Sequence, residues 1–230
     1  MPEDHAKSDP AVELFDRDGA SAGAQARTKD LLGLLAARTC WIFDLDGTLT
    51  MPVHDFSLIR LELEIPEGAD ILGHLETLSP HQAALRRGRL DAIERDLAER
   101  ALAAPGMTEL LALLDGLDLP LGILTRNSRE VALTTLEAIG ARRYFEEGHV
   151  LGRDQAPPKP DPAGILHLLQ GWGLGAGGAA MVGDYLFDLQ AGRAAGAVTV
   201  HVGRPDGQRW PEMSDVIVDD LTQLVALLGF

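Results

Sequence analysis

The feature that most constrains the fold is the stretch at residues 41–50, Trp-Ile-Phe-Asp-Leu-Asp-Gly-Thr-Leu-Thr. Its apolar run is too short for a helix, is rich in β-formers and ends abruptly at Asp44, Asp46 and Gly47. In extended backbone both carboxylates would leave the same face, about 7 Å apart. They would repel unless a cation lies between them or one is protonated. The stretch therefore predicts a buried strand that ends in a reactive loop; an ordinary solvated Asp-x-Asp-Gly turn is the alternative.

The second half of the chain alternates between two kinds of pattern. From residue 106 onward, short apolar runs of strand length are separated by stretches at helical spacing. Strands are expected at 119–124, 149–151, 179–182, 198–202 and 216–218, and helices at 107–114, 128–139, 162–172, 185–195 and 221–228. This alternation predicts an α/β fold, a Rossmann-like parallel sheet covered by helices on both faces. Ligands of such sheets bind at the carboxyl ends of the strands.

Residues 51–105 have a different character. They contain no convincing strand and carry apolar residues at helical spacing, interrupted by Pro66, Pro80 and Pro105, with Ser79-Pro80 a plausible helix start. We interpret them as a small α-helical cap inserted after the first strand. The catalytic core then comprises residues 28–50 and 106–230, and residues 1–27, polar and without periodicity, form a flexible tail.

Composition limits the possible partners. The 230 residues have a formal net charge of −15, which repels nucleic acid and anionic membranes alike. The same charge repels phosphorylated metabolites, so a phosphate site needs local positive charge or a divalent cation. No run of 18 apolar residues exists and the N-terminal segment does not resemble a secretory signal, so we expect a cytoplasmic protein. It is a monomer or a homodimer; the sequence does not distinguish them.

Thr125 follows a predicted strand directly, in Ile-Leu-Thr-Arg-Asn-Ser. A hydroxyl at a strand end, next to the free N–H groups of a helix N-terminus, is suited to binding a phosphate oxygen. Thr, Asn and Ser are also ordinary helix-capping residues, and this alternative stays open.

Lys159 is the only lysine beyond residue 30, in a chain that otherwise uses arginine. It lies in Ala-Pro-Pro-Lys-Pro-Asp-Pro, where the prolines restrict the backbone. A fixed ammonium is a point charge that can neutralise Asp44 and a phosphate together. The alternative is a lysine in a surface loop.

The stretch at residues 181–188, Met-Val-Gly-Asp-Tyr-Leu-Phe-Asp, has the same pattern as residues 41–50: a short apolar run followed by two aspartates. An apolar strand ends at Asp184, and Asp188 lies one helical turn further on, on the same face. Hard oxygen ligands at this density suit Mg²⁺, which accepts one or two carboxylates and a phosphate. Asp188 alone is also a normal residue for a helix start.

These four motifs, in this order, resemble those of the haloacid dehalogenase superfamily of phosphohydrolases. The resemblance covers about residues 40–230, and the helical insert looks like the small cap of the phosphoglycolate phosphatase and β-phosphoglucomutase branch. It implies that Asp44 is the nucleophile and that Asp46 is the acid, then the base. It also implies that Thr125 and the N–H groups beside Arg126 bind the phosphoryl oxygens, while Lys159 holds the nucleophile and the phosphoryl charge.

The resemblance also implies a cofactor and a function. Asp44, the carbonyl of Asp46 and Asp184 would ligate Mg²⁺, with Asp188 supporting directly or through water. We therefore predict a Mg²⁺-dependent phosphatase acting on a small phosphomonoester, phosphoglycolate or a sugar phosphate, through an aspartyl-phosphate. A β-phosphoglucomutase-type phosphomutase and a non-catalytic phosphate- or Mg²⁺-binding regulatory protein are the alternatives.

The chain departs from the family's pattern in the second motif. Family members often carry Asn directly after the Thr of the second motif, whereas Arg126 intervenes here and Asn127 follows. The role of Asn127 in phosphate binding therefore stays open, and Arg126 becomes a candidate substrate contact. In the cap, we expect Asp55, Phe56 and Arg60 to face the site, because they follow the catalytic loop closely.

Overall fold

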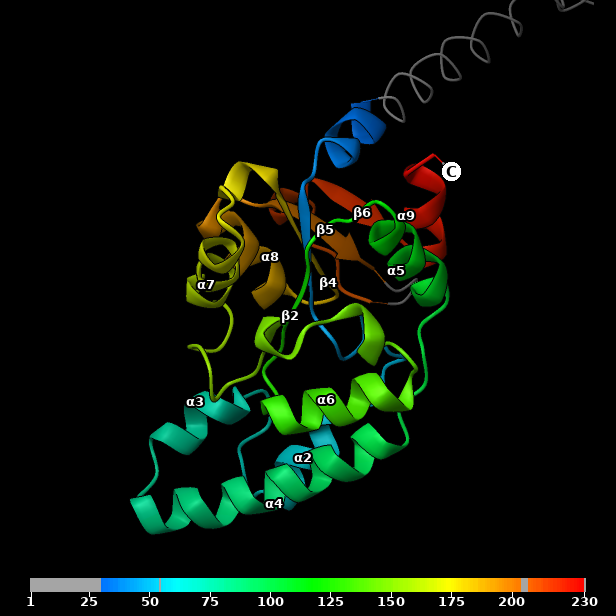
Figure 1. Ribbon diagram of the computed structural model, residues 1–230. Coiled ribbons are helices and arrows are strands. Elements are labelled where there is room, and N and C mark those ends of the chain that lie inside the picture. The colour runs from blue at the N-terminus through cyan, green and yellow to red at the C-terminus, as the bar shows by residue number, and fades with distance from the viewer. Residues whose placement is uncertain (1–29, 54, 204–206, 230) are drawn as a thin grey trace, which may run out of the picture.

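The fold is built on a six-stranded, wholly parallel sheet with the order β3-β2-β1-β4-β5-β6. The computed structural model describes residues 30–53, 55–203 and 207–229, so the predicted tail, residues 1–27, lies outside the described residues. The strands are β1 (Cys40–Phe43), β2 (Leu121–Leu124), β3 (Val150–Leu151), β4 (Ala179–Gly183), β5 (Val198–Val202) and β6 (Val216–Val218). The predicted α/β, Rossmann-like parallel sheet is confirmed (Figure 1).

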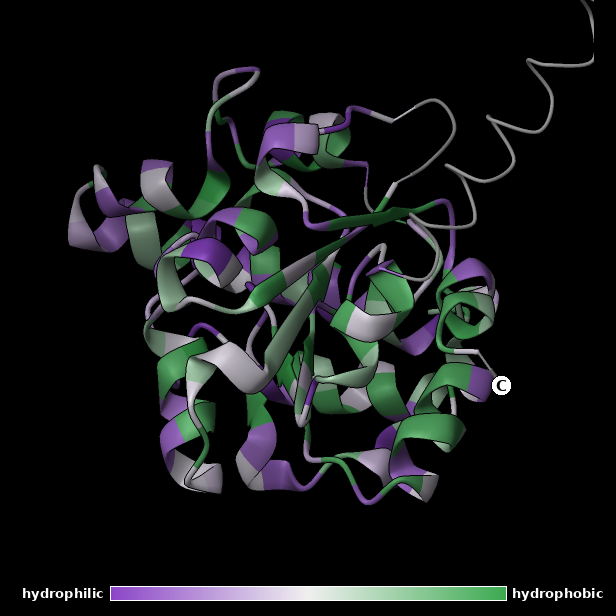
Figure 2. Cartoon of the chain, turned by 90° about the horizontal axis from the view of Figure 1, so that it is seen from above, coloured by the Kyte–Doolittle hydropathy of each residue, from purple (hydrophilic) through white to green (hydrophobic). Residues whose placement is uncertain are grey.

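Helices cover both faces of the sheet (Figure 1). One face carries α5 (Met107–Gly116), α6 (Arg129–Ala138) and α9 (Leu221–Leu227), and the other carries α7 (Ala163–Trp172) and α8 (Leu186–Ala195). Figure 2 shows hydrophobic residues along the strands between these layers. No helix in the described part of the chain is both long and apolar enough to cross a membrane.

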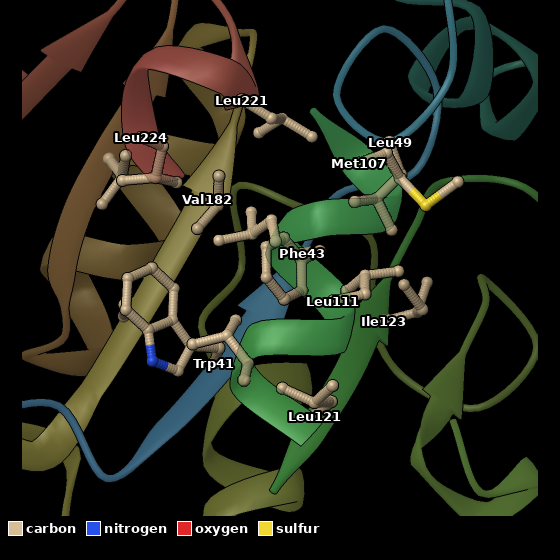
Figure 3. Packing of buried hydrophobic residues seen from close by; sticks show 14 of the residues in the cluster. Trp41, Phe43, Leu49, Met107, Leu111, Leu121, Ile123, Val182, Leu221 and Leu224 are labelled. Atoms are coloured by element: carbon tan, nitrogen blue, oxygen red, sulfur yellow. The ribbon is translucent and has the colours of Figure 1, made fainter. Parts of the chain in front are cut away.

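Strand β1 shows how the sequence produces two cores. Trp41 and Phe43 point to one face and pack with residues of α5 and α9 (Figure 3). Cys40 and Ile42 point to the other face and join the cluster under α7 and α8. All four are fully buried, because successive side chains of a strand alternate between faces and here both faces are covered. The short apolar run therefore belongs in the centre of the sheet, where its carboxyl end carries Asp44.

Element boundaries follow local chemistry. Helix α6 begins after Ser128, whose hydroxyl accepts a hydrogen bond from the Val131 N–H, and Gly140 follows its end with φ of 71°. The strand predicted at 119–124 is shorter than expected: β2 starts only after Pro120, which has no N–H to donate to a neighbouring strand.

In its described residues, the insert between β1 and α5 consists of helices and loops. It contains α2 (Phe56–Glu62), α3 (Ile71–Glu76) and α4 (Pro80–Glu99), and α4 starts at the predicted Ser79-Pro80. Its buried apolar residues form a cluster of their own, including Ile59, Leu75 and Leu90. The chain leaves and re-enters the core side by side, through an antiparallel bridge between Thr50 and Ala103. The domain boundaries at 51 and 105 stay a prediction.

Candidate active site

A cavity of about 550 Å³ lies between the insert and the carboxyl ends of the central strands. The order of the strands explains its place: the chain runs outward from β1 on one side through β2 and β3, and on the other side through β4, β5 and β6. Crevices form where the strand order reverses in this way. The core residues that line the cavity come from the loops after β1, β2, β4 and β5, from the first turn of α8 and from the Pro-rich loop: Asp44, Asp46, Gly47, Thr125, Arg126, Asn127, Lys159, Asp184, Tyr185, Phe187, Asp188, Gly207, Gln208 and Trp210.

Lys159 occupies the floor of this cavity. Its ammonium nitrogen Nζ lies 2.5 Å from Oδ1 of Asp44 and 2.6 Å from Oδ1 of Asp188. Only 3% of the residue is exposed, so Lys159 is a buried ion-pair partner and not a lysine of a surface loop. The expected contact between Lys159 and Asp44 is therefore present.

Three carboxylates converge beside this ammonium. Asp44, Asp184 and Asp188 each offer an oxygen, and these oxygens lie within 4.8 Å of one another. Asp188 also accepts a hydrogen bond from the Tyr185 N–H at 3.0 Å, so it caps α8 as well as joining the cluster. Gly183 makes this approach possible, because a Cβ there would lie 2.2 Å from the Cβ of Asp188.

The electrostatics of the cluster fit a divalent cation. Burial raises the pKa of Asp44 well above its ordinary value, and the carboxylates of Asp188, Asp184 and Asp46 raise it further against the opposing effect of Lys159. Burial alone would lower the pKa of Lys159, but Asp188 and Asp44 raise it. One ammonium thus faces several carboxylates. Their excess negative charge and hard oxygen donors are what Mg²⁺ prefers.

Asp46 is held apart from this cluster. Its Oδ2 accepts a hydrogen bond of 2.7 Å from Nδ2 of Asn127. The Asn127 N–H in turn donates to Oγ1 of Thr125 at 3.1 Å, and both residues are buried. The sequence left the role of Asn127 open, and the structure makes it a partner of the Asp46 carboxyl. This hydrogen bond involves the carboxyl group of Asp46, whereas the predicted metal ligand is its backbone carbonyl oxygen.

The guanidinium of Arg126 joins the core to the insert. It lies 2.5 Å from Oδ1 of Asp70 and 4.9 Å from the centre of the Phe187 ring. Asp70 is also the N-cap residue of α3. The charge of Arg126 is therefore already paired, and a substrate would have to compete with Asp70 for the side chain. The predicted contribution of the neighbouring backbone N–H groups does not depend on this pair.

The insert supplies a largely apolar wall that includes Phe56 and Arg60, and their role in substrate specificity stays a prediction. Arg60 is half-buried and its Nε donates to the Ala69 carbonyl at 2.8 Å, but it has no acidic partner among the described residues. Asp55 does not line the cavity, so that expectation was wrong: its carboxylate accepts hydrogen bonds from the first turn of α2 instead. A carboxylate at a helix start satisfies N–H groups that have no partner within the helix.

Sequence reasoning missed four further residues near the site. Asp70 and Phe187 contact Arg126, and Glu94 lines the cavity beside Arg153, whose side chain is 14% exposed. Burial raises the pKa of Glu94 to about 7, against the opposing effect of Arg153. Asp70, Glu94 and Arg153 lie outside the four motifs, and Phe187 lies within the fourth without having been singled out. Their roles depend on contacts between distant segments.

The comparisons with known proteins agree with this geometry. The family model of haloacid dehalogenase-like hydrolases matches residues 67–202, more than half of the chain. The chain belongs to the haloacid dehalogenase-like hydrolase family. A haloacid dehalogenase-like hydrolase domain-containing protein of Arabidopsis thaliana is 32% identical over 170 residues, covering 69% of this chain and 68% of that protein. The predicted family and enzyme class, a hydrolase of this family, are confirmed.

Two other proteins resemble the chain, one in sequence and one in fold. A phosphoglycolate phosphatase of Chromobacterium violaceum is 28% identical over 211 residues, covering 81% of this chain and 94% of that protein. A hydrolase from Pseudomonas syringae, solved as a crystal structure, superposes with a TM-score of 0.70 at 24% identity and covers 83% of this chain and 97% of its own. That likeness supports the fold of this family member.

Proposed function

We propose that the protein is a Mg²⁺-dependent phosphatase that hydrolyses a small phosphomonoester through an aspartyl-phosphate on Asp44. The observation that carries the proposal is that Asp44, Asp46 and Lys159 all line one cavity, although they come from distant parts of the sequence. Relatives named phosphoglycolate phosphatase support the choice of reaction.

In the first step a carboxylate oxygen of Asp44 attacks phosphorus and the bond to the leaving oxygen breaks. Asp46, oriented by Asn127, gives its proton to that oxygen, so the leaving group departs as an alcohol. Lys159 offsets the negative charge of Asp44 and of the phosphoryl group. The Thr125 hydroxyl and the following N–H groups bind the equatorial oxygens, which carry most of the charge in the transition state.

In the second step water attacks the aspartyl-phosphate. Asp46, now a carboxylate, takes the proton of the water, and phosphate leaves while Asp44 is regenerated. Asp44, Asp184 and Asp188, with the Asp46 carbonyl, are the groups that would hold Mg²⁺. Bound there, the cation supplies neutralisation of phosphoryl and carboxylate charge.

The cavity informs the substrate class. At about 550 Å³ it has the size of a small-molecule site and exceeds the needs of a two-carbon acid such as glycolate. Phe56, Ile59 and Leu72 give it an apolar side, and Arg60, which has no acidic partner within the described part of the chain, adds a cation to that side. The substrate is therefore a phosphomonoester whose leaving group has an apolar part and a second anionic or polar group.

The test is phosphate release from a panel of phosphoglycolate, sugar phosphates and larger phosphomonoesters, with Mg²⁺ and with a chelator. Turnover that requires Mg²⁺ is the expected result, with larger esters preferred over phosphoglycolate. Activation by a sugar bisphosphate, with transfer of the phosphoryl group to a sugar, would replace the phosphatase by a phosphomutase. No release of phosphate from any ester by folded, Mg²⁺-binding protein would leave a binding protein instead.

Arg60→Ala is expected to raise KM for an anionic substrate more than it lowers kcat. The guanidinium lies on the insert side of the cavity, where it contacts the leaving group equally in the ground and transition states. Arg87→Ala is the matched control, because Arg87 is exposed on the same insert and does not line the cavity. A rise in KM matched by an equal fall in kcat, or a similar effect of Arg87→Ala, would contradict the proposed contact of Arg60 with the substrate.

A further inference from the structure

A second charge cluster, in which Glu94 is buried, Arg153 largely buried and Asp91 half-exposed, links the insert to the core. Arg153, in the loop after β3, bonds through Nη2 to Asp91 at 2.5 Å and to Glu94 at 2.8 Å, both on α4. Its Nη1 also lies 3.1 Å from the other oxygen of Glu94. The side chains of Arg153 and Glu94 are 14% and 8% exposed, so this fork–fork pair is shielded from water.

Arg153 also donates hydrogen bonds to the loop after β2. Its Nη1 donates to the Arg126 carbonyl at 2.9 Å, and its own N–H donates to the Asn127 carbonyl at 2.9 Å. Gly152 allows this approach, because a Cβ there would lie 2.6 Å from the Asn127 carbonyl oxygen and 2.4 Å from the Arg129 nitrogen. Arg153 thus binds two consecutive backbone carbonyls of this loop, those of Arg126 and Asn127, and both residues also line the cavity.

We propose that Arg153 is a positioning residue that couples the seating of α4 on the core to the geometry of the loop formed by residues 125–127. Asn127 holds Asp46, and the backbone of this loop supplies the proposed phosphate contacts. Arg153 keeps this hydrogen-bond geometry while Asp91 and Glu94 hold its guanidinium in place. Its contribution to turnover rests on the proposed function, whereas its hold on the loop does not.

The test compares two double variants, each of which removes one arginine–glutamate pair between α4 and the core. Arg153→Met/Glu94→Gln deletes the buried pair without leaving a buried charge behind. Arg95→Met/Glu130→Gln deletes the exposed pair, 3.2 Å apart, which does not touch the loop. We expect the first to lower kcat about tenfold to a hundredfold, with a smaller change in KM, and to speed amide exchange at residues 125–127. The second should leave both unchanged.

The two proposals fail in different ways. If the wild-type protein releases no phosphate, the proposed function fails and the exchange of the loop amides alone decides the role of Arg153. If Arg153→Met/Glu94→Gln lowers only the melting temperature, with exchange and kcat equal to those of the control, Arg153 is merely structural and the inference is overturned. Glu94→Gln alone leaves the Arg153 bonds to Asp91 and to the two loop carbonyls, so it should lower kcat less than the double variant does. A loss equal to that of the double variant would place the effect on Glu94 instead.

Discussion

Asp44→Asn is expected to reduce phosphate release at least about a thousandfold, because the amide cannot form the aspartyl-phosphate and no other described carboxylate follows β1 as closely. The fold should survive. The substitution removes one buried negative charge from the crowded cluster, while Lys159 keeps its 2.6 Å contact with Asp188. Phosphate-release kinetics and thermal unfolding, measured on the same preparation, separate the two effects.

The matched control is Asp55→Asn. It makes the same chemical change close by in sequence, but Asp55 only caps α2, and asparagine caps helices equally well. Its kcat, KM and melting temperature should equal those of the wild type. Activity of Asp44→Asn within tenfold of the wild type would remove Asp44 from the nucleophilic role. A large loss in Asp55→Asn would show that activity is sensitive to any lost acid in this segment.

The core of the site was predictable because its groups follow strands that the sequence marks clearly. Asp44, Thr125 and Asp184 each come directly after a short apolar run, and parallel strands bring their carboxyl ends to one edge of the sheet. Lys159 stood out for another reason: the rest of the described chain uses arginine for its basic side chains. Local pattern and residue usage are sufficient for such positions.

The cap side of the site was not predictable in the same way. Arg126 looked available to a substrate, but Asp70, far away in sequence, pairs with it. Arg153 lies in a loop with no motif, and its partners on α4 are two acids on an otherwise ordinary charged helix. Asp55 was assigned to the cavity by its nearness to the catalytic loop, whereas the open N–H groups of α2 determine its orientation. Each of these outcomes depends on tertiary packing or on a precise helix boundary.

Lys159→Met is expected to destabilise the protein strongly when a chelator is present. The ammonium is buried and contacts Asp44 and Asp188, so methionine leaves two buried carboxylates without their counter-charge. Breaking a buried pair by removing one partner costs about 3–5 kcal/mol. Because the same oxygens offer a cation site, millimolar Mg²⁺ should recover part of this loss. Thermal unfolding with and without Mg²⁺ measures both effects, and turnover should fall in either condition.

A second variant separates the stabilising role of Lys159 from its chemical role. Lys159→Met/Asp188→Asn removes one of the stranded carboxylates together with the ammonium, so its melting temperature in chelator should lie above that of Lys159→Met. Its turnover should stay as low as that of the single variant, because the phosphoryl group still lacks the ammonium and Asp188, one of the proposed Mg²⁺ ligands, is lost as well. If turnover returns together with stability, Lys159 only stabilises the fold, and its proposed role in neutralising the phosphoryl charge is wrong. If stability does not return, the cost of Lys159→Met lies in packing and not in unpaired charge.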